Sequence, residues 1–403
     1  MPRLRLRALD INKVKVMDSM TQAGSAAASA PQPWVLQICH GYDGPFLDCA
    51  RQYASLFAGT RYRVMTVYLT GAADASVQAG SASDEVLFLG YSSRDMRGLK
   101  LSAISEIRRL VSTYDFRLCI AHRFKPTYIA CLATSLPVLG INHAFGVYRR
   151  RLRRLFATTF VERLTLVGVS AAVRDDIRSC LPGWPDERIV SLHNRIDIAD
   201  YEADLLDSAA ARAQLGLPAD TWIVGNVGRL HPDKDQATLI RGFAAALPSL
   251  PPNSVLAIAG QGRLRAALEA LAAQLGIAAH TVFLGQVPHA RMYFRAFDVF
   301  ALSSDHEPFG MVLLEAMVAG VPVVCTDCGG APEIVEGIGD LVPLGRSDAM
   351  AECLMALSQR SPEQLDAQRS AMRQRLLERF SDAAAGRAFW SLPVMSAFTD
   401  QPG

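Results

Sequence analysis

Lysine is scarce in this sequence of 403 residues, and long apolar runs are absent. Only Lys13, Lys15, Lys100, Lys125 and Lys234 occur, and arginine supplies the rest of the 41 basic side chains, against 39 acidic ones. The formal charge is therefore only +2, which argues against binding of nucleic acid through bulk positive charge. No run approaches the roughly 18 apolar residues of a membrane-spanning helix. Half of the residues are nevertheless apolar, which excludes a globally disordered chain.

Paired metal-ligand motifs and a complete dinucleotide motif are also missing. The eight cysteines are irregularly spaced and mostly lie in apolar runs, so we interpret them as reduced core thiols of a cytoplasmic protein. Cys325 and Cys328 form a C-x-x-C pair, but no second pair and no H-x-x-x-H motif completes a zinc site. The G-x-G at residues 260–262 is not a dinucleotide fingerprint, because Arg265 stands at the third glycine position.

The N-terminal 33 residues have a basic beginning without the apolar stretch of a secretory signal. Residues 21–33 are small, polar and proline-containing, which is typical of a flexible linker. We predict that residues 1–33 form a flexible basic leader. The alternative is a weak amphipathic contact of residues 1–17 with a membrane.

Short apolar runs alternate with helical patterns along the rest of the chain. The runs that we expect to form buried strands lie at residues 35–39, 62–69, 85–89, 118–121, 138–142, 165–169 and 189–192, and again at 221–230, 254–259, 281–284, 299–302 and 321–325. This alternation predicts an α/β fold with two Rossmann-like, doubly wound domains facing each other across a cleft. We place the N-terminal domain at residues 34–200 and the C-terminal domain at 201–382. A terminal helix within 383–403 is expected to pack back on the N-terminal domain.

The segment around Glu307 and Glu315 is the richest in candidate functional residues. It follows a predicted strand, Pro308 suits the first turn of a helix, and Gly320 suits its end. Glu315 then lies on an otherwise apolar helix, where an unpartnered carboxylate is costly. Roughly 12 Å of helix separates the two carboxylates, so they can hold two ends of an elongated ligand, with an anion between them at the helix N-terminus. The alternative is one capping glutamate and one salt-bridged structural glutamate.

Two further strand ends carry candidate binding residues. Arg229 and Lys234 flank a turn that contains proline, and both can converge on one anion such as a diphosphate. Gly329 and Gly330 follow a buried strand and allow a ligand to approach the backbone closely. The alternatives are a solvated loop with two ordinary cations and a simple tight turn.

Histidines and arginines gather at strand ends of the N-terminal half. His40, His122 and His143 each follow a predicted strand. A ligand contact and a structural role are both open for them. Residues 148–154 (YRRRLRR) hold the densest positive charge, which suits a phosphorylated ligand or an anionic membrane. A solvated helical face is the alternative for this run.

The ordered set of motifs resembles a known family. The motifs that carry the likeness are Arg229 with Lys234, the E-P-F-G-x4-E run from Glu307 to Glu315, and the G-G-x-P-E run from Gly329. In this order they look like the signature of retaining glycosyltransferases of family four (GT4), which have the GT-B fold. The H-N-R-I-D segment at the predicted domain junction is also similar, although Arg195 stands where that family has glycine. The likeness covers residues 34–345.

The resemblance implies a role for each matching residue. Arg229 and Lys234 would bind the diphosphate of the donor. Glu307 would hold hydroxyls of the transferred sugar, and Glu315 the nucleotide ribose. His143 would lie beside the anomeric centre, so that it and Glu307 are the predicted catalytic residues. Further donor contacts would come from Gly41 or Gly44, Val287, Phe309, Gly310, Met311, Gly329 and Gly330. We assign acceptor contacts to His122, Arg149 and Arg150.

The implied reaction is retaining transfer of a sugar from a UDP-, GDP- or ADP-sugar to a hydroxyl of a glycan or glycolipid. It would use no metal or other cofactor, and the lysine inside Asp233-Lys234-Asp235 argues against a metal there. We expect a role in bacterial surface polysaccharide or lipopolysaccharide core synthesis, no nucleic-acid partner, and a cytoplasmic location with contact to the inner membrane. The alternatives are a nucleotide-sugar epimerase of the same fold and a noncatalytic paralogue that binds sugar nucleotides or glycans.

Overall fold

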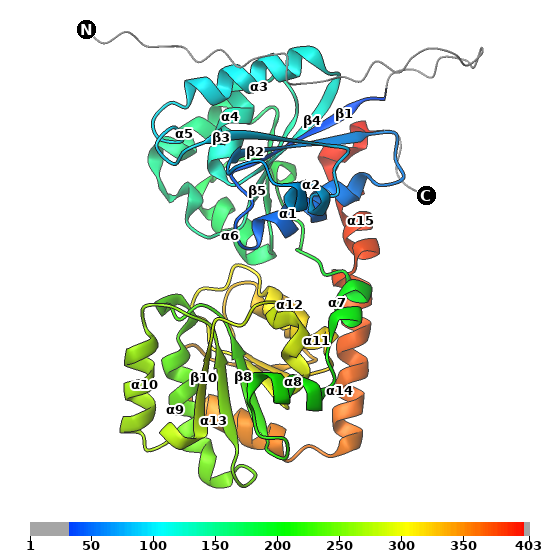
Figure 1. The fold of residues 1–403 in the computed structure, drawn as a ribbon. Helices are drawn as coiled ribbons and strands as arrows, with labels where there is room; N and C mark the ends of the chain where they lie inside the picture. The colour runs from blue at the N-terminus through cyan, green and yellow to red at the C-terminus, as the bar shows by residue number, and fades with distance from the viewer. Residues whose placement is uncertain (1–31, 399–403) are drawn as a thin grey trace, which may run out of the picture. The chain divides into compact units, whose positions relative to one another are not determined.

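Two parallel sheets, of seven and six strands, carry the fold in the computed structural model, which describes residues 32–398. The predicted leader at residues 1–33 lies almost wholly outside the described residues. Because both faces of a parallel sheet must be covered, helices flank each sheet (Figure 1). The predicted α/β class with two doubly wound units is confirmed. We call the part built on the seven-stranded sheet the N-terminal lobe and the part built on the six-stranded sheet the C-terminal lobe.

The N-terminal lobe contains the first seven strands of the chain. They are β1 (Trp34–Cys39), β2 (Arg63–Thr70), β3 (Glu85–Tyr91), β4 (Phe116–His122), β5 (Val138–Asn142), β6 (Leu164–Gly168) and β7 (Ile189–Ser191). Their order in the sheet is β3-β2-β1-β4-β5-β6-β7. The helices are α1 (Phe46–Ala54), η2 (Ser55–Phe57), α2 (Ala75–Gly80), α3 (Leu101–Thr113), α4 (Phe124–Ala133), η3 (Val147–Arg149), α5 (Arg151–Thr159), α6 (Ala171–Cys180) and η4 (Asp186–Arg188).

The C-terminal lobe contains the remaining six strands. They are β8 (Ile223–Val227), β9 (Val255–Ala259), β10 (Thr281–Gly285), β11 (Val299–Leu302), β12 (Val323–Thr326) and β13 (Asp340–Val342). Their order is β10-β9-β8-β11-β12-β13. The helices from residue 198 onward are α7 (Ile198–Asp204), α8 (Ser208–Leu215), η5 (Pro232–Lys234), α9 (Gln236–Ala246), η6 (Leu247–Ser249), α10 (Arg265–Gln274), η7 (Ala278–His280), η8 (Ala290–Ala296), α11 (Met311–Val318), α12 (Ala331–Val335), α13 (Ser347–Ser358), α14 (Pro362–Arg375), η9 (Leu376–Phe380), α15 (Asp382–Trp390) and η10 (Pro393–Ala397).

The direction of strand ordering reverses once in each sheet. In the N-terminal lobe the reversal lies between β1 and β4, and in the C-terminal lobe between β8 and β11. Open α/β sheets bind ligands outside the carboxyl ends of their strands at such a reversal, because the loops there diverge. The residues that follow these four strands are therefore the first to inspect for a site.

One helix begins later than the sequence suggests. Pro308 does not stand in the first turn of α11, which begins at Met311. The residue before this helix is Gly310, with φ +111°, a conformation that glycine adopts without strain. The backbone of Glu307 is held instead by the amide of Gly330, which donates to its carbonyl at 2.8 Å. The segment from Glu307 to Gly310 is thus a loop braced by its neighbour.

The C-terminal segment lies against the N-terminal lobe (Figure 1). The indole of Trp390 donates to the carbonyl of Leu56 at 3.1 Å, and the rings of Phe389 and Trp390 lie 5.5 and 5.6 Å from that of Phe57. Arg195, which stands where the family that the motifs resemble has glycine, is buried and donates to Asp382 at the start of α15.

The described residues include neither a disulfide nor a candidate membrane span. All eight cysteines are free thiols. Within residues 32–398, no helix combines the length and the apolar character that crossing a bilayer requires.

Candidate functional site

A buried ion pair marks the strand reversal of the C-terminal lobe. Lys234 ends η5 after β8, and Glu307 follows β11. The Lys234 Nζ atom lies 2.6 Å from Oε2 of Glu307, and the two side chains are only 18% and 10% exposed. The hydroxyl of Ser304 donates to the same carboxylate oxygen at 3.2 Å. Two predicted donor-binding residues therefore meet where the fold favours a ligand.

Arg229 belongs to the same loop but is far more exposed. Its side chain is 70% exposed and lies 3.0 Å from Oδ2 of Asp233. His231 Nδ1 lies 2.6 Å from the other oxygen of that carboxylate. Arg229 can therefore turn toward an arriving anion, whereas Lys234 is fixed by Glu307.

The glycine pair in this lobe is packed against the chain itself. A Cβ atom on Gly329 would lie 2.1 Å from the carbonyl oxygen of Glu307, and one on Gly330 would lie 2.7 Å from that of Pro308. Gly329 also has φ +58°, which disfavours other residues. The two glycines thus set the position of Glu307, in addition to any contact with a ligand.

The G-x-G at residues 260–262 has a similar structural role. A Cβ atom on Gly260 would lie 1.8 Å from the carbonyl oxygen of Gly228, and one on Gly262 would lie 2.3 Å from that of Leu230. These glycines let the loop after β9 pack against the Arg229 loop, which agrees with the rejection of a dinucleotide motif.

Glu315 lies on α11 and carries a perturbed carboxyl group. Desolvation and the nearby Asp48 raise its pKa to about 7, while Arg291 opposes the shift. Near neutral pH this carboxyl is partly protonated, so it can donate and accept hydrogen bonds. That property suits a diol such as a ribose.

The other predicted donor contacts are less directly placed. The side chain of Phe309 is buried against His193 and Phe380, which leaves only its backbone for a ligand. Gly310 and Met311 form the N-terminal end of α11. Val287 follows the edge strand β10, which β9 separates from β8, and its contact with the donor base stays a prediction.

In the N-terminal lobe, a chain of hydrogen bonds fixes the state of His143. The amide nitrogen of Gln37 donates to the carbonyl of Ala50 at 3.0 Å and to the hydroxyl of Thr66 at 2.8 Å. Its oxygen therefore faces His122, whose Nε2 lies 3.2 Å away and must donate. The Nδ1 atom of His122 then accepts from Nε2 of His143, 3.3 Å away.

This chain leaves Nδ1 of His143 as a bare acceptor. Burial and the charge of Arg123 lower the pKa of His143 to about 4, and burial lowers that of His122 well below its usual range. Both imidazoles are therefore neutral near pH 7. His122 is buried behind His143, so its position suits orientation of His143 better than contact with an acceptor.

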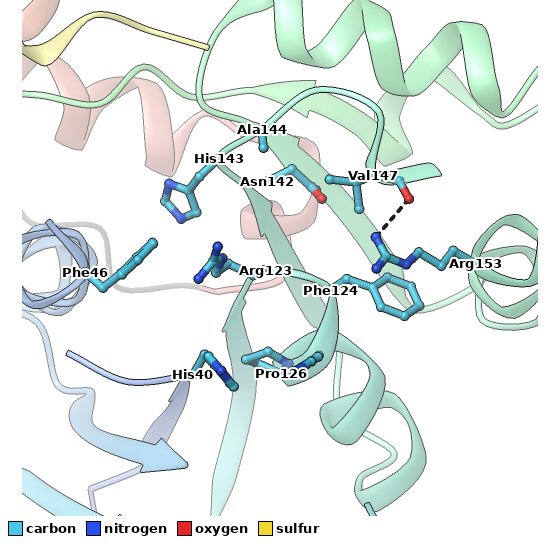
Figure 2. Close-up of a pocket in the computed structure, with 11 residues that line it drawn as sticks. His40, Phe46, Arg123, Phe124, Pro126, Asn142, His143, Ala144, Val147 and Arg153 are labelled. Atoms are coloured by element: carbon cyan, nitrogen blue, oxygen red, sulfur yellow. Dashed lines mark hydrogen bonds between the residues drawn. The ribbon is translucent and has the colours of Figure 1, made fainter. Parts of the chain in front are cut away.

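A pocket of about 390 Å³ opens beside His143 (Figure 2). Its lining residues are His40, Phe46, Arg123, Phe124, Lys125, Pro126, Asn142, His143, Ala144, Val147 and Arg153. Arg149 and Arg150 do not line it, and Arg149 lies 3.4 Å from Asp176 instead. Arg153, of the same arginine run, does line it. Sequence reasoning selected the arginine run but did not single out this member.

Gly41 and Gly44 lie in the loop that follows β1. A Cβ atom on Gly41 would lie 2.7 Å from the hydroxyl of Thr70, so its neighbour is a side chain of the same lobe. Gly44 has φ +60° and open space around it. The predicted approach of a diphosphate to this loop stays a prediction.

The glutamate of the G-G-x-P-E motif holds a helix of the N-terminal lobe. The amides of Ala171 and Ala172, which begin α6, donate to the carboxylate of Glu333 at 2.8 Å each. Nε2 of His193 lies 2.7 Å from the same carboxylate. Burial raises the pKa of Glu333, but these hydrogen bonds outweigh it and lower the pKa overall. Sequence reasoning gave Glu333 no role.

Comparison with known proteins identifies the C-terminal lobe. Residues 207–374 match the model of a family described as glycosyl transferases group 1. This stretch of the chain is similar to that family over most of the C-terminal lobe. The match confirms the resemblance drawn from the motifs, and it contains both Lys234 and Glu307.

Relatives and solved structures of this glycosyltransferase family agree. A D-inositol 3-phosphate glycosyltransferase of Mycobacteroides abscessus is 38% identical over 182 residues, which are 42% of this chain and 41% of that protein. The chain thus matches less than half of the length of this relative. A glycosyltransferase from Rickettsia africae superposes with a TM-score of 0.78 at 15% identity, over 92% of this chain and 100% of that one. HepE of Anabaena, solved with UDP-glucose, gives 0.70 at 22% identity, over 91% and 100%. The two superpositions establish the GT-B fold.

Proposed function

We propose that this protein transfers a sugar from a nucleoside diphosphate sugar to a hydroxyl group, with retention at the anomeric carbon. The observation that carries the proposal is the Lys234–Glu307 pair, held at the strand reversal of a lobe that is similar to a glycosyltransferase family. Glu307 offers carboxylate oxygens to sugar hydroxyls, and Lys234 supplies positive charge beside them. Recognition of both donor parts at one point is what sugar transfer requires.

Departure of the nucleoside diphosphate is the step that this lobe can promote. The leaving group gains negative charge, and Lys234, Arg229 and the N-terminal end of α11 can stabilise it. Positive charge from these groups is the basis for proposing catalysis without a metal. The bond from the anomeric carbon to the diphosphate then breaks, the acceptor oxygen attacks the same face of the short-lived oxocarbenium ion, and the hydroxyl proton passes to the departing phosphate oxygen. His143, with its free Nδ1, is proposed to lie beside that centre.

The proposed donor is a UDP-, GDP- or ADP-sugar. HepE, a structural neighbour, was solved with UDP-glucose, which favours a uridine nucleotide as the first to test. The proposed acceptor is a glycan or glycolipid of bacterial surface polysaccharide or lipopolysaccharide core synthesis at the cytoplasmic face of the inner membrane.

A panel of sugar nucleotides tests the donor proposal. Saturation at 100 times the dissociation constant should add about 2.7 kcal/mol to the free energy of unfolding. Arg229→Ala should weaken binding about 10-fold or more, because hydrogen bonds to charged groups contribute about 1.5–3 kcal/mol. Arg265→Ala is the matched control. Like Arg229, Arg265 is an exposed arginine that forms an ion pair with a carboxylate four residues later, here Glu269. No stabilisation by any nucleotide would contradict the proposal.

A test of the residues needed for turnover requires a variant that still folds. Replacing Lys234 by alanine would leave the buried Glu307 without its partner, which costs about 3–5 kcal/mol. Glu307→Gln removes the charge but keeps the shape, so it is the cleaner variant, and we expect it to abolish transfer. Conversion of the free sugar nucleotide without an acceptor would favour the epimerase, and binding without turnover would favour the noncatalytic paralogue.

We further propose that the N-terminal lobe contacts an anionic membrane through α5 and the start of α3. Four large apolar side chains are exposed there, and they are Leu99 at 66%, Leu101 at 68%, Leu152 at 81% and Leu155 at 68%. Tyr128 contacts both Lys100 and Phe156, which places the two segments side by side. Arg151 and Arg154 of α5 adjoin Leu152 and Leu155 in the sequence, and basic side chains beside apolar ones favour binding to anionic lipid. Co-sedimentation with phosphatidylglycerol vesicles should be lost in the double variant with Leu152→Ser and Leu155→Ser.

A further inference from the structure

The pocket of the N-terminal lobe is strongly one-sided in charge. Its lining includes Arg123, Lys125 and Arg153, and none of its 11 lining residues is acidic. The three cations come from two elements, the start of α4 and α5, and Figure 2 shows Arg123 and Arg153 on opposite sides of Phe124. Three positive charges without a compensating acid are unusual in a protein whose overall charge is nearly balanced.

These cations lack the carboxylate partners that many other arginines among the described residues have, such as Arg51, Arg212 and Arg360. Arg123 lies over the ring of Phe46, 4.4 Å from its centroid. Arg153 lies 4.6 Å from the centroid of Phe124 and donates to the carbonyl of Val147 at 3.2 Å. Among residues 32–398, no carboxylate lies within ion-pair distance of Arg123, Lys125 or Arg153. Their charge is therefore available to a ligand.

The positive charge of the pocket also lowers the pKa values of its histidines. Burial lowers the pKa of His40, and Lys125 and Arg123 lower it further, whereas Asp43 opposes them. Nδ1 of His40 is buried and has no hydrogen-bond partner among the described residues.

The backbone at Arg123 is strained, which indicates that its side chain has a function. Its φ is +74° and its ψ is 166°, a conformation that is essentially reserved for glycine and costs about 1–3 kcal/mol. Glycine at this position would remove the strain, yet the sequence has arginine. Arg123 also immediately precedes α4, whose first amides, on Phe124 and Lys125, have no partner within the helix.

We propose that this pocket binds an anionic group of the acceptor, a phosphate ester or a carboxylate, through Arg123, Lys125 and Arg153. That the ligand is the acceptor rests on the proposed function, whereas the anion site itself does not. A volume of about 390 Å³ accommodates one sugar bearing such a group. Because His143 lines the same pocket, a hydroxyl of that sugar can reach the free Nδ1 atom. The anion would thus fix which hydroxyl is presented.

The test measures binding of glucose 6-phosphate by calorimetry in the absence of any donor. We expect binding to the full chain that weakens as salt is added. It should weaken about 10-fold or more in Arg123→Gly, Lys125→Gln and Arg153→Gln, because each removes a charged contact. Arg123→Gly also relieves the strained backbone, so its thermal stability checks that the fold is intact. Arg109→Gln on α3 is the control, an exposed cation of the same lobe outside the pocket, and should bind normally.

A second arm identifies the source of the anion. Vesicles of phosphatidylcholine with phosphatidic acid should retain the wild type more than the three pocket variants if the acceptor is a lipid phosphate. Preference for the soluble ester in the same comparison identifies a soluble acceptor, and both outcomes support the site. Equal affinity for glucose 6-phosphate in the wild type and all three variants would overturn the proposal. Because no sugar nucleotide is present, that result would leave the donor proposal standing.

Discussion

At the residue scale, the state of His143 is set by a glutamine that never approaches the pocket. The orientation of the Gln37 amide decides which nitrogen of His122 donates, and His122 decides which nitrogen of His143 remains free. A substitution at Gln37 would therefore change the chemistry of His143 without touching a ligand.

Folding stability should depend on pH through His143. Burial and Arg123 lower its pKa to about 4 in the folded protein, from an ordinary value of 6.5. Between these values the unfolded chain binds a proton that the folded chain does not. The free energy of unfolding should therefore decrease by about 2 kcal/mol from this residue as pH falls from 7 to 5. Urea unfolding at both pH values measures it, and the decrease should be smaller by this amount in His143→Gln. An equal decrease in the two proteins would contradict the assigned pKa.

The position of His143 could be predicted because it follows a strand, but its tautomer could not, because that depends on contacts between distant segments. Arg123 and Lys125 also follow a predicted strand directly, so their position at a strand end could have marked them as candidate ligand contacts. Arg153 was visible only as one of several arginines. Which of them faces the pocket depends on how Phe156 packs α5 against α4.

At the element scale, the loops after β8 and β11 are braced by other loops rather than by their own sequence. The prediction that Pro308 lies in the first turn of α11 was wrong. The backbone of Glu307 is held by Gly330, so the chain stays a loop until Met311. The sequence pattern located the strand ends well, since buried runs and glycines mark them. It could not show which loops touch, because that requires the strand order.

Gly330→Ala should displace the loop that carries Glu307. The added Cβ would lie 2.7 Å from the carbonyl oxygen of Pro308 and 2.9 Å from Cα of Phe309, both of which are backbone atoms. We expect a loss of about 1–3 kcal/mol in the free energy of unfolding and about 10-fold weaker binding of the donor. Thermal unfolding and nucleotide titration measure the two effects.

Gly386→Ala is the control for this substitution. Gly386 lies within α15, and a Cβ there would meet nothing within 4 Å. The change should be neutral or raise stability by about 0.4–1 kcal/mol. If both alanine variants behaved alike, the bracing of Glu307 by Gly330 would be refuted.

At the scale of the whole molecule, both candidate sites lie at strand reversals of their sheets. The pocket lies at the ends of β1, β4 and β5, and the Lys234–Glu307 pair at the ends of β8 and β11. The α/β class could be predicted because strand and helix patterns alternate through the chain. The long-range ties could not, because Arg195 and Trp390 each pair with residues far away in the sequence.

Trp390→Ala should destabilise the N-terminal lobe although the residue is near the end of the chain. The indole is buried against Phe57 and donates to the carbonyl of Leu56. Removing a large buried aromatic side chain costs about 3–5 kcal/mol. Urea unfolding should show this loss, whereas Ser391→Ala, an exposed neighbour, should change stability by less than about 0.5 kcal/mol. Similar losses in both variants would contradict the assigned contact.

The return of α15 to the first lobe also constrains the order in which the protein can mature on the ribosome. The first lobe is synthesised early, and lobes generally fold as units as they emerge. Its aromatic face around Phe57, however, meets Phe389 and Trp390, which are made only after the second lobe. A nascent chain therefore presents that face uncovered throughout translation of the second lobe, and emergence of α15, rather than completion of the first sheet, is the event that covers it.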